Sequence, residues 1–209
     1  MGEFELHNRP AFVPLADRRY ACQQHYRGVF GIRQCERIVR IGEGLPRSEG
    51  EVSSGFSEGS DQLTRRAGIS WMDPGPDHYW IFEKLARVVA RANRYYQFDL
   101  TGFTEDAQFT RYEDKGAFYD WHQDGLEGEL SMRKLSLVVQ LTDPDEYEGG
   151  DLEFFSLSSD PELGAAWRDD LRLQGSVSVF PSFEHHRVTP MVRGSRHSLV
   201  CWVGGPPFR

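Results

Sequence analysis

The sequence lacks long apolar runs and is poor in cysteine, and each absence excludes a class of protein. No stretch approaches the roughly 20 apolar residues of a membrane-spanning helix, so we do not expect a membrane protein. The three cysteines are too few and too scattered for a disulfide framework, and no two have CxxC spacing. Residues 1–13 have neither the basic start nor the apolar stretch of a signal peptide. We therefore expect a cytoplasmic protein.

Basic residues are in the minority as well. Lys and Arg number 24 against 32 Asp and Glu, which gives a net charge of -8. Such a surface repels a phosphate backbone, so we expect no nucleic-acid partner. A length of 209 residues suffices for one sizeable core and is short for two. We therefore interpret residues 1–209 as a single domain, and the sequence leaves both a monomer and a homodimer open.

The first part of the chain has helical patterns separated by a polar segment. Residues 33–42 and 77–95 repeat apolar side chains at helical spacing, with Asp77 as the expected N-cap of the longer helix. Residues 25–30 are interpreted as a first strand. Residues 43–66 are rich in Gly, Ser and charge, which predicts a loop. A lid over an active site and a plain surface loop are the two interpretations of that loop.

Beyond residue 98 the pattern changes to short strands separated by Gly, Pro and Asp clusters. Helices followed by a long series of strands indicate a β-sandwich or a barrel backed by N-terminal helices. The predicted strands cover residues 107–113, 117–122, 133–142, 151–155, 175–180, 186–191 and 195–203.

A possible metal site begins at the end of the strand-like segment FYDWHQD, which contains His122 and Asp124. Residues two apart on a strand face the same side, so the imidazole and the carboxylate converge as two members of a 2-His-1-carboxylate facial triad. The alternative interpretation is an ordinary surface strand that carries His122 and Asp124 as two polar residues without a metal. The later segment GSVSVFPSFEHHRVTP offers His185 and His186 as the third ligand. This ligand set leaves positions open for a bidentate 2-oxo acid and O₂.

The strand SRHSLVCWV supplies a candidate anchor for such a cosubstrate. A 2-oxo acid bound to the metal through its keto end leaves its distal carboxylate inside the barrel, where an unpaired charge costs several kcal/mol. The guanidinium of Arg196 can pair with it bidentately, and Ser198 faces the same side. Alternatively, Arg196 pairs with an acidic residue at the end of the barrel.

Together these segments resemble the prolyl 4-hydroxylase-like 2-oxoglutarate/Fe(II) dioxygenases, especially the bacterial PKHD-type hydroxylases. The resemblance covers about residues 107–203, through RYEDKGAFYDWHQD, KLSLVVQLTDPDEYEGGDLEFF and GSVSVFPSFEHHRVTPMVRGSRHSLVCWV. It implies that His186, which precedes V-x-P, is the ligand and His185 its neighbour. It also implies that Arg196, in a G-x-R step, binds 2-oxoglutarate.

The resemblance further concerns the cosubstrate pocket. It implies that Tyr112 hydrogen-bonds 2-oxoglutarate, with an ordinary strand aromatic as the alternative. Gln140 stands where several relatives carry a tyrosine that contacts the distal carboxylate. That departure leaves the second partner of the carboxylate open. Trp202 either lines the pocket or belongs to the core, and His197 points away from the face of Arg196.

The fold implied is mainly β with flanking α-helices. Its core is a double-stranded β-helix, which is jelly-roll or cupin-like, over about residues 99–209, with helical support over about residues 1–98.

The implied function is a dioxygenase that hydroxylates an unactivated C–H bond with Fe(II), 2-oxoglutarate and O₂, and the family also implies ascorbate. His122, Asp124 and His186 are the expected catalytic metal ligands, while Arg196, Ser198 and Tyr112 are the expected cosubstrate residues. A prolyl or other amino-acid residue of a peptide or protein is the expected substrate, and a free amino acid or another small molecule is the alternative. A non-catalytic jelly-roll metal-binding protein and a metal-dependent hydrolase or isomerase are the rival functions.

Overall fold

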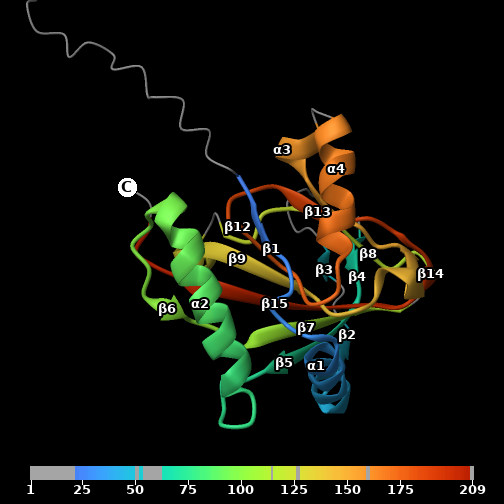
Figure 1. The fold of residues 1–209 in the computed structure, drawn as a ribbon, viewed down its shortest axis with the longest axis horizontal. Coiled ribbons are helices and arrows are strands. Elements are labelled where there is room, and N and C mark those ends of the chain that lie inside the picture. Colours follow the sequence, from blue (N-terminus) through green and yellow to red (C-terminus); the bar gives the residue numbers. More distant parts are fainter. Residues whose placement is uncertain are drawn as a thin grey trace, which may run out of the picture.

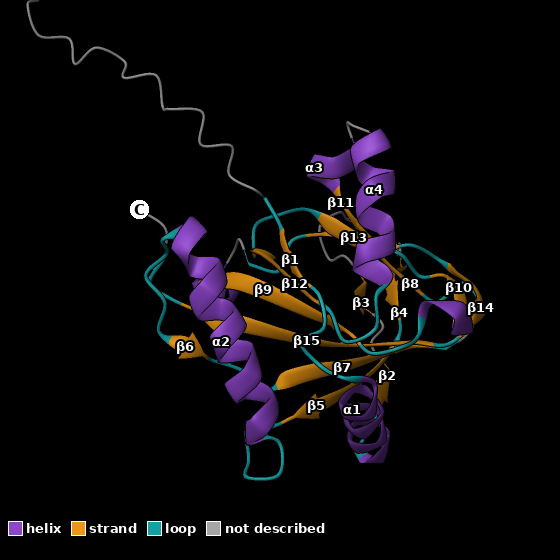
Figure 2. Cartoon of the chain, viewed as in Figure 1, coloured by secondary structure: helices purple, strands orange, loops and turns teal. Residues whose placement is uncertain are grey.

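A computed structural model describes residues 22–49, 52–53, 63–113, 115–125, 128–158 and 161–207. Figure 1 shows the helices in two groups around a body of strands. The first group holds α1 (Ile32–Gly44) and α2 (Tyr79–Tyr96), and the second holds α3 (Phe155–Ser158) and α4 (Pro161–Arg172). In Figure 2 the strands lie between these two groups.

The main sheet is antiparallel, and its described strands follow the order β1-β12-β9-β15-β7-β5-β2, with β6 paired to β15. Strands far apart in the chain are thereby neighbours, as a jelly roll requires. The bounds are β1 (Gln24–Tyr26), β12 (Val177–Pro181), β9 (Arg133–Gln140), β15 (Arg196–Gly204), β7 (Ala107–Tyr112), β5 (Gly68–Met72), β2 (Ser48–Glu49) and β6 (Gly102–Phe103).

A second antiparallel sheet has the order β11-β13-β8-β4-β3, and β10 pairs with β14 beside it. A buried cluster that includes Tyr112, Val138, Leu152, Phe154 and Val188 joins the two sheets face to face. The predicted double-stranded β-helix is therefore confirmed. The bounds are β11 (Leu152–Phe154), β13 (His186–Val188), β8 (Phe118–His122), β4 (Leu63–Arg66), β3 (Val52–Ser53), β10 (Tyr147–Gly149) and β14 (Met191–Gly194).

The alternation of side chains along β9 decides what each face of the main sheet contacts. Leu135, Leu137 and Val139 are fully buried in the cluster that includes the apolar faces of α1 and α2. Ser136 and Gln140 are buried on the opposite face, between the two sheets. Truncating a buried leucine typically costs about 2–5 kcal/mol, so the helix-facing positions stabilise the fold. The polar positions face an interior that can bind a ligand.

Both predicted N-terminal helices are present, but the start of the second differs from the prediction. The α2 helix begins at Tyr79 with His78 as its N-cap, and the cap makes no side-chain hydrogen bond. The backbone amides of His78 and Tyr79 both donate to the carbonyl of Gly75. This turn satisfies the amide of Tyr79, one of those that an Asp77 cap would accept from, and the N-cap is His78. The prediction of Asp77 as N-cap was therefore wrong.

The N-terminal part contains more strands than the sequence predicted. Strands β2, β3 and β4 lie within residues 43–66, which were predicted as a loop, and β5 was not predicted at all. Backbone pairing with β7 and β8 organises these short polar segments, and their composition does not reveal it. Residues 50–51 and 54–62 lie outside the described residues, so the prediction of a lid remains a prediction.

Two further differences concern the ends of elements and an insertion. The first strand is shorter than residues 25–30, because the chain turns after Tyr26. The α4 helix between β11 and β12 was missed, although Leu171 joins the buried cluster between the sheets.

All three cysteines are free thiols. Within the described ranges, no helix combines the length and apolar character needed to cross a membrane.

Candidate active site

Three side chains able to bind a metal meet where the second sheet faces the interior. The ligand atoms of His122, Asp124 and His186 lie within 4.8 Å of one another. The two histidines are paired in register on β8 and β13, and their ring centroids are 4.2 Å apart. The Asp124 carboxylate oxygens lie 3.6 Å from Nε2 of His122 and 3.7 Å from Nε2 of His186. The exposed His185 is not part of the cluster.

Backbone carbonyls set the tautomers of both histidines. Nδ1 of His122 lies 2.7 Å from the carbonyl of Asp120, and Nδ1 of His186 lies 2.9 Å from that of Glu184. A carbonyl oxygen only accepts, so each Nδ1 carries a proton and each neutral ring has its lone pair on Nε2. Both lone pairs are thus presented beside the Asp124 carboxylate, as metal binding requires.

The position of Asp124 has a different cause from the one expected. Strand β8 ends at His122, so Asp124 lies in a bend beyond it. The backbone amides of Asp124 and Gly125 both donate to the carbonyl of Ser182, at 2.9 and 3.0 Å. The loop after β12 therefore folds the carboxylate back toward the histidines, and strand alternation alone does not account for it.

The charge states of the cluster suit a cation. Burial raises the pKa of the Asp124 carboxyl, but attraction to His186 and His122 when they are protonated, together with the hydrogen bond from the Ser136 hydroxyl, outweighs burial and holds the pKa well below its usual range. Ser136 Oγ donates to Asp124 Oδ2 at 2.6 Å. Burial lowers the pKa of His186 to about 4, against the opposing effect of Asp124. The site therefore presents a carboxylate and a neutral imidazole over a wide pH range.

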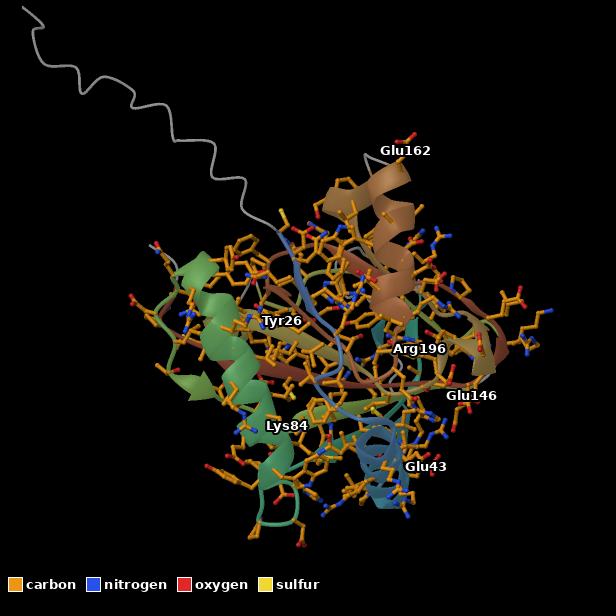
Figure 3. All side chains as sticks on the ribbon, in the orientation of Figure 1. Tyr26, Glu43, Lys84, Glu146, Glu162 and Arg196 are labelled. Atoms are coloured by element: carbon orange, nitrogen blue, oxygen red, sulfur yellow. The ribbon has the colours of Figure 1, made fainter. Side chains whose placement is uncertain are left out.

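A buried arginine lies on the main sheet facing the same interior. Arg196 is 2% exposed, and Figure 3 shows it within the body of the molecule, beside the strands. Its Nε donates to Oε1 of Gln140 at 3.0 Å, and its carbon Cζ lies 5.4 Å from the ring centroid of Tyr112. Its Nη1 is buried without a hydrogen-bond partner. A buried unpaired N–H donor of a guanidinium is costly unless an anion binds there.

Gly150 makes room for this arginine. Its φ of +61° lies in the left-handed region that favours glycine. A Cβ at this position would lie 3.3 Å from Cδ of Arg196 and would collide with the sulfur of Met191. Glycine at position 150 is therefore required mainly by the close approach of Met191, and it also leaves room for the Arg196 side chain beside it.

One cavity of about 280 Å³ joins the metal cluster to the arginine. Its size is near the lower end of small-molecule pockets. The six side chains predicted from the sequence all line it, and they are Tyr112, His122, Asp124, His186, Arg196 and Ser198. Trp202 lines it too, while His197 stacks on Phe109 on the helix-facing side of the sheet.

Sequence reasoning assigned no role to two residues that support the ligands, although Tyr119 belongs to the Y-x-x-H-x-D pattern that the chain shares with the prolyl 4-hydroxylase-like family. The ring of Tyr119 stacks on His122 with centroids 3.4 Å apart, and burial raises the pKa of its phenol to about 12. Ser136 holds Asp124, as described above. Ser136 alternates with leucines on a buried strand, the same signal that identified Ser198, and could have been found in this way.

The mouth of the cavity combines aromatic and cationic groups. Trp71 and Leu130 line it and are 46% and 47% exposed. The Trp71 ring lies 6.2 Å from that of Trp202, over which the guanidinium of Arg133 stacks at 3.8 Å. Arg133 also donates to the carbonyl of Asp124 at 3.1 Å and pairs with Glu105. Arg133 thus contacts both the backbone of a metal-ligand candidate and the aromatic side chains at the mouth.

A family model described as the 2OG-Fe(II) oxygenase superfamily matches residues 107–204. Residues 107–204 belong to that superfamily. Among curated proteins, a PKHD-type hydroxylase of Xylella fastidiosa (strain M23) is 30% identical over 131 residues, which are 58% of this chain and 54% of the relative. The chain therefore spans about half the length of that relative.

Solved structures share the fold of this 2OG-Fe(II) oxygenase segment and its surroundings. A prolyl-4-hydroxylase from Pseudomonas putida aligns with a TM-score of 0.65 at 20% identity, over 88% of this chain and 93% of its own. A prolyl hydroxylase from Trichoplax adhaerens, solved with a hypoxia inducible factor oxygen degradation domain peptide fragment, aligns with a TM-score of 0.59 at 15% identity, over 88% and 83%. At sequence identities of 20% and 15%, these alignments show a shared fold and not a shared substrate.

The donors present fit Fe(II) and 2-oxoglutarate, the cofactors that the superfamily's description names. Two neutral imidazoles and one carboxylate are the ligand set of non-haem Fe(II) oxygenases, and it leaves adjacent positions open for other ligands. Across the same cavity, the unpartnered Nη1 of Arg196 suits a carboxylate.

Proposed function

We propose that this chain is a 2-oxoglutarate- and Fe(II)-dependent dioxygenase that hydroxylates an unactivated C–H bond of a prolyl or other amino-acid residue in a peptide or protein. The observation that carries the proposal is the placement of the three-ligand cluster and the unpartnered Arg196 Nη1 around one cavity. A hydrolase or a plain metal-binding protein has no need of a buried cation at that place.

In this proposal His122, Asp124 and His186 hold the metal. Ser136 orients the Asp124 carboxylate, and the carbonyls of Asp120 and Glu184 hold the histidine rings in the required tautomer. Such supporting hydrogen bonds typically change metal affinity about 10–100-fold when removed.

Arg196 and Ser198 bind the distal carboxylate of 2-oxoglutarate, and Tyr112 hydrogen-bonds the cosubstrate. The three residues are neighbours on adjacent strands, because Arg196 pairs in register with Tyr112, and Ser198 with Gln140. Iron held by these three ligands would supply the redox chemistry that couples oxidative decarboxylation of 2-oxoglutarate by O₂ to hydroxylation of a C–H bond. The chain itself orients the two substrates and limits the access of water to a mostly buried cavity.

A peptide substrate is favoured by the mouth of the cavity. The half-exposed side chains of Trp71 and Leu130 offer an apolar surface to a side chain that enters the cavity. The Trichoplax adhaerens relative with a bound peptide fragment shares the fold. A prolyl ring is small and apolar enough to enter between such side chains while the peptide backbone stays outside.

The experiment is a screen for succinate release with Fe(II), 2-oxoglutarate and O₂ against three panels: peptides, free amino acids and small metabolites. We expect stimulation by a peptide whose mass increases by one oxygen atom. If only free amino acids stimulate succinate release, the proposed peptide substrate is wrong and the proposed reaction stands. Metal-dependent turnover without any need for 2-oxoglutarate would indicate a hydrolase or isomerase instead.

A further inference from the structure

A buried hydrogen-bond chain extends from Arg196 to a phenol that neither the metal cluster nor the predicted cosubstrate residues include. Arg196 Nε donates to Oε1 of Gln140, and Nε2 of Gln140 donates to the hydroxyl of Tyr147 at 3.1 Å. All three side chains are 2% exposed. The chain therefore joins β15, β9 and β10 in the interior between the sheets.

The orientation of the Gln140 amide follows from its neighbours. A guanidinium only donates, so the atom facing Arg196 Nε is the amide oxygen. The amide nitrogen then faces Tyr147 and the carbonyl of Thr142, which lies at 3.1 Å and only accepts. Two independent partners thus require the same orientation, and the reverse one would place donors against donors.

This arrangement leaves the Tyr147 proton without an acceptor. The phenol oxygen receives the N–H of Gln140, and a second cation, Arg172, lies over the ring at 4.2 Å. Among the described residues, no group accepts a hydrogen bond from the Tyr147 hydroxyl. Burial raises the pKa of this phenol, and Arg196 opposes that effect, so the two groups interact electrostatically. The phenol therefore stays protonated as a donor at neutral pH.

Among the described residues, Nη1 of Arg196 has no hydrogen-bond partner and the hydroxyl of Tyr147 has no acceptor. The two side chains are close enough to interact electrostatically. Buried donors are costly when unpaired, and a carboxylate with two oxygens can accept from both. We propose that Tyr147 is a second binding partner of the distal carboxylate of 2-oxoglutarate, and that Gln140 is a positioning residue that aims both donors. The inference rests on the proposed function.

The test compares two ligands on the metal-loaded full chain under anaerobic conditions. The ligands are 2-oxoglutarate and 2-oxopentanoate, which carries a methyl group in place of the distal carboxylate. Calorimetry measures the affinity of each for wild type and for Tyr147→Phe. We expect Tyr147→Phe to weaken 2-oxoglutarate binding by about tenfold or more, because a hydrogen bond to a charged group is lost. Binding of 2-oxopentanoate should not change.

Tyr96→Phe is the matched control. Tyr96 is an equally buried phenol that donates to the carbonyl of Val179 at 3.0 Å, but it belongs to α2 on the helix-facing side of the sheet. Removal of the Tyr96 hydroxyl should change the affinity for neither 2-oxoglutarate nor 2-oxopentanoate. If Tyr147→Phe does not melt cooperatively, Gln140→Met gives the same comparison, because it removes the contacts to both donors and keeps the chain length of the side chain.

The outcomes separate this inference from the proposed function. Equal losses for both ligands, or no loss in either variant, would overturn the role of Tyr147 and Gln140 while leaving the enzyme class intact. A wild-type chain that binds metal but binds neither 2-oxo acid would overturn the proposed function itself. A loss confined to 2-oxoglutarate supports both.

Discussion

His122 and His186 are direct register partners on the antiparallel strands β8 and β13. This pairing sets their ring centroids 4.2 Å apart, although the two residues are distant in the sequence. The pairing continues from β13 to β11, so the histidines belong to a sheet and not to mobile loops. A site held in this way keeps its geometry before the metal binds, which is the condition for tight and selective binding.

Removal of a metal ligand is the first prediction. His122→Ala, Asp124→Ala and His186→Ala should each abolish activity and sharply weaken Fe(II) binding, since each takes away one of three protein ligands. His185→Ala is the matched control, because His185 is exposed and lies outside the cluster. Metal titration of the four variants measures the effect. Loss of metal in His185→Ala with retention in His186→Ala would show that the ligand is the other histidine.

A second prediction concerns Ser136. Ser136→Ala removes the 2.6 Å hydrogen bond to Asp124 Oδ2, so metal affinity should fall about 10–100-fold. Ser178→Ala is the control, because Ser178 is buried on β12 and hydrogen-bonds His25 at 3.2 Å, away from the cluster. Competition with a chromogenic chelator measures both affinities. Equal behaviour of the two variants would contradict the role of Ser136.

Arg196 should set cosubstrate affinity without affecting metal affinity. Truncating one partner of a buried charge pair typically costs about 2–5 kcal/mol, so Arg196→Ala should raise the KM for 2-oxoglutarate roughly 30-fold or more. Arg196→Lys should recover only part of this, because an ammonium cannot form the bidentate contact. Separate measurements of Fe(II) and 2-oxoglutarate binding test the prediction. An unchanged affinity for 2-oxoglutarate in Arg196→Ala would remove the assigned anchor.

Acid should destabilise the metal-free protein through His186. Burial lowers its pKa to about 4, whereas an unfolded histidine titrates near 6.5. Between these values the unfolded chain binds a proton that the native chain does not, so stability falls as the pH drops from about 6.5 toward 4. Denaturant unfolding of wild type and His186→Asn across this range measures the effect. The slope should be smaller in the variant, and equal slopes would contradict the assignment.

The sequence was informative wherever a short motif fixes chemistry. Spacing identified His122 and Asp124 as a pair, and alternation along one strand placed Arg196 and Ser198 on one face; all four line the cavity. The choice between His185 and His186 needed the family resemblance, since either residue could be brought to the site by a shift of one position along the strand.

Other features depend on contacts between distant segments and could not be predicted. Asp124 reaches the histidines because a bend is held on the carbonyl of Ser182, far along the chain. Strand β5 and the short strands β2 to β4 exist by pairing with the main strands, and their polar composition predicted a loop. The α4 helix is a different case, because Pro161 at its first position and Glu162 in its first turn are helix-start signals that our interpretation of the sequence missed.

The most direct test of the account is a single-turnover measurement. The full chain is loaded anaerobically with Fe(II) and 2-oxoglutarate together with the peptide panel, O₂ is then admitted, and succinate is counted per protein. The account predicts close to one succinate per metal-loaded chain in wild type and none in Asp124→Ala. Absence of succinate from wild type that demonstrably holds both Fe(II) and 2-oxoglutarate would contradict it.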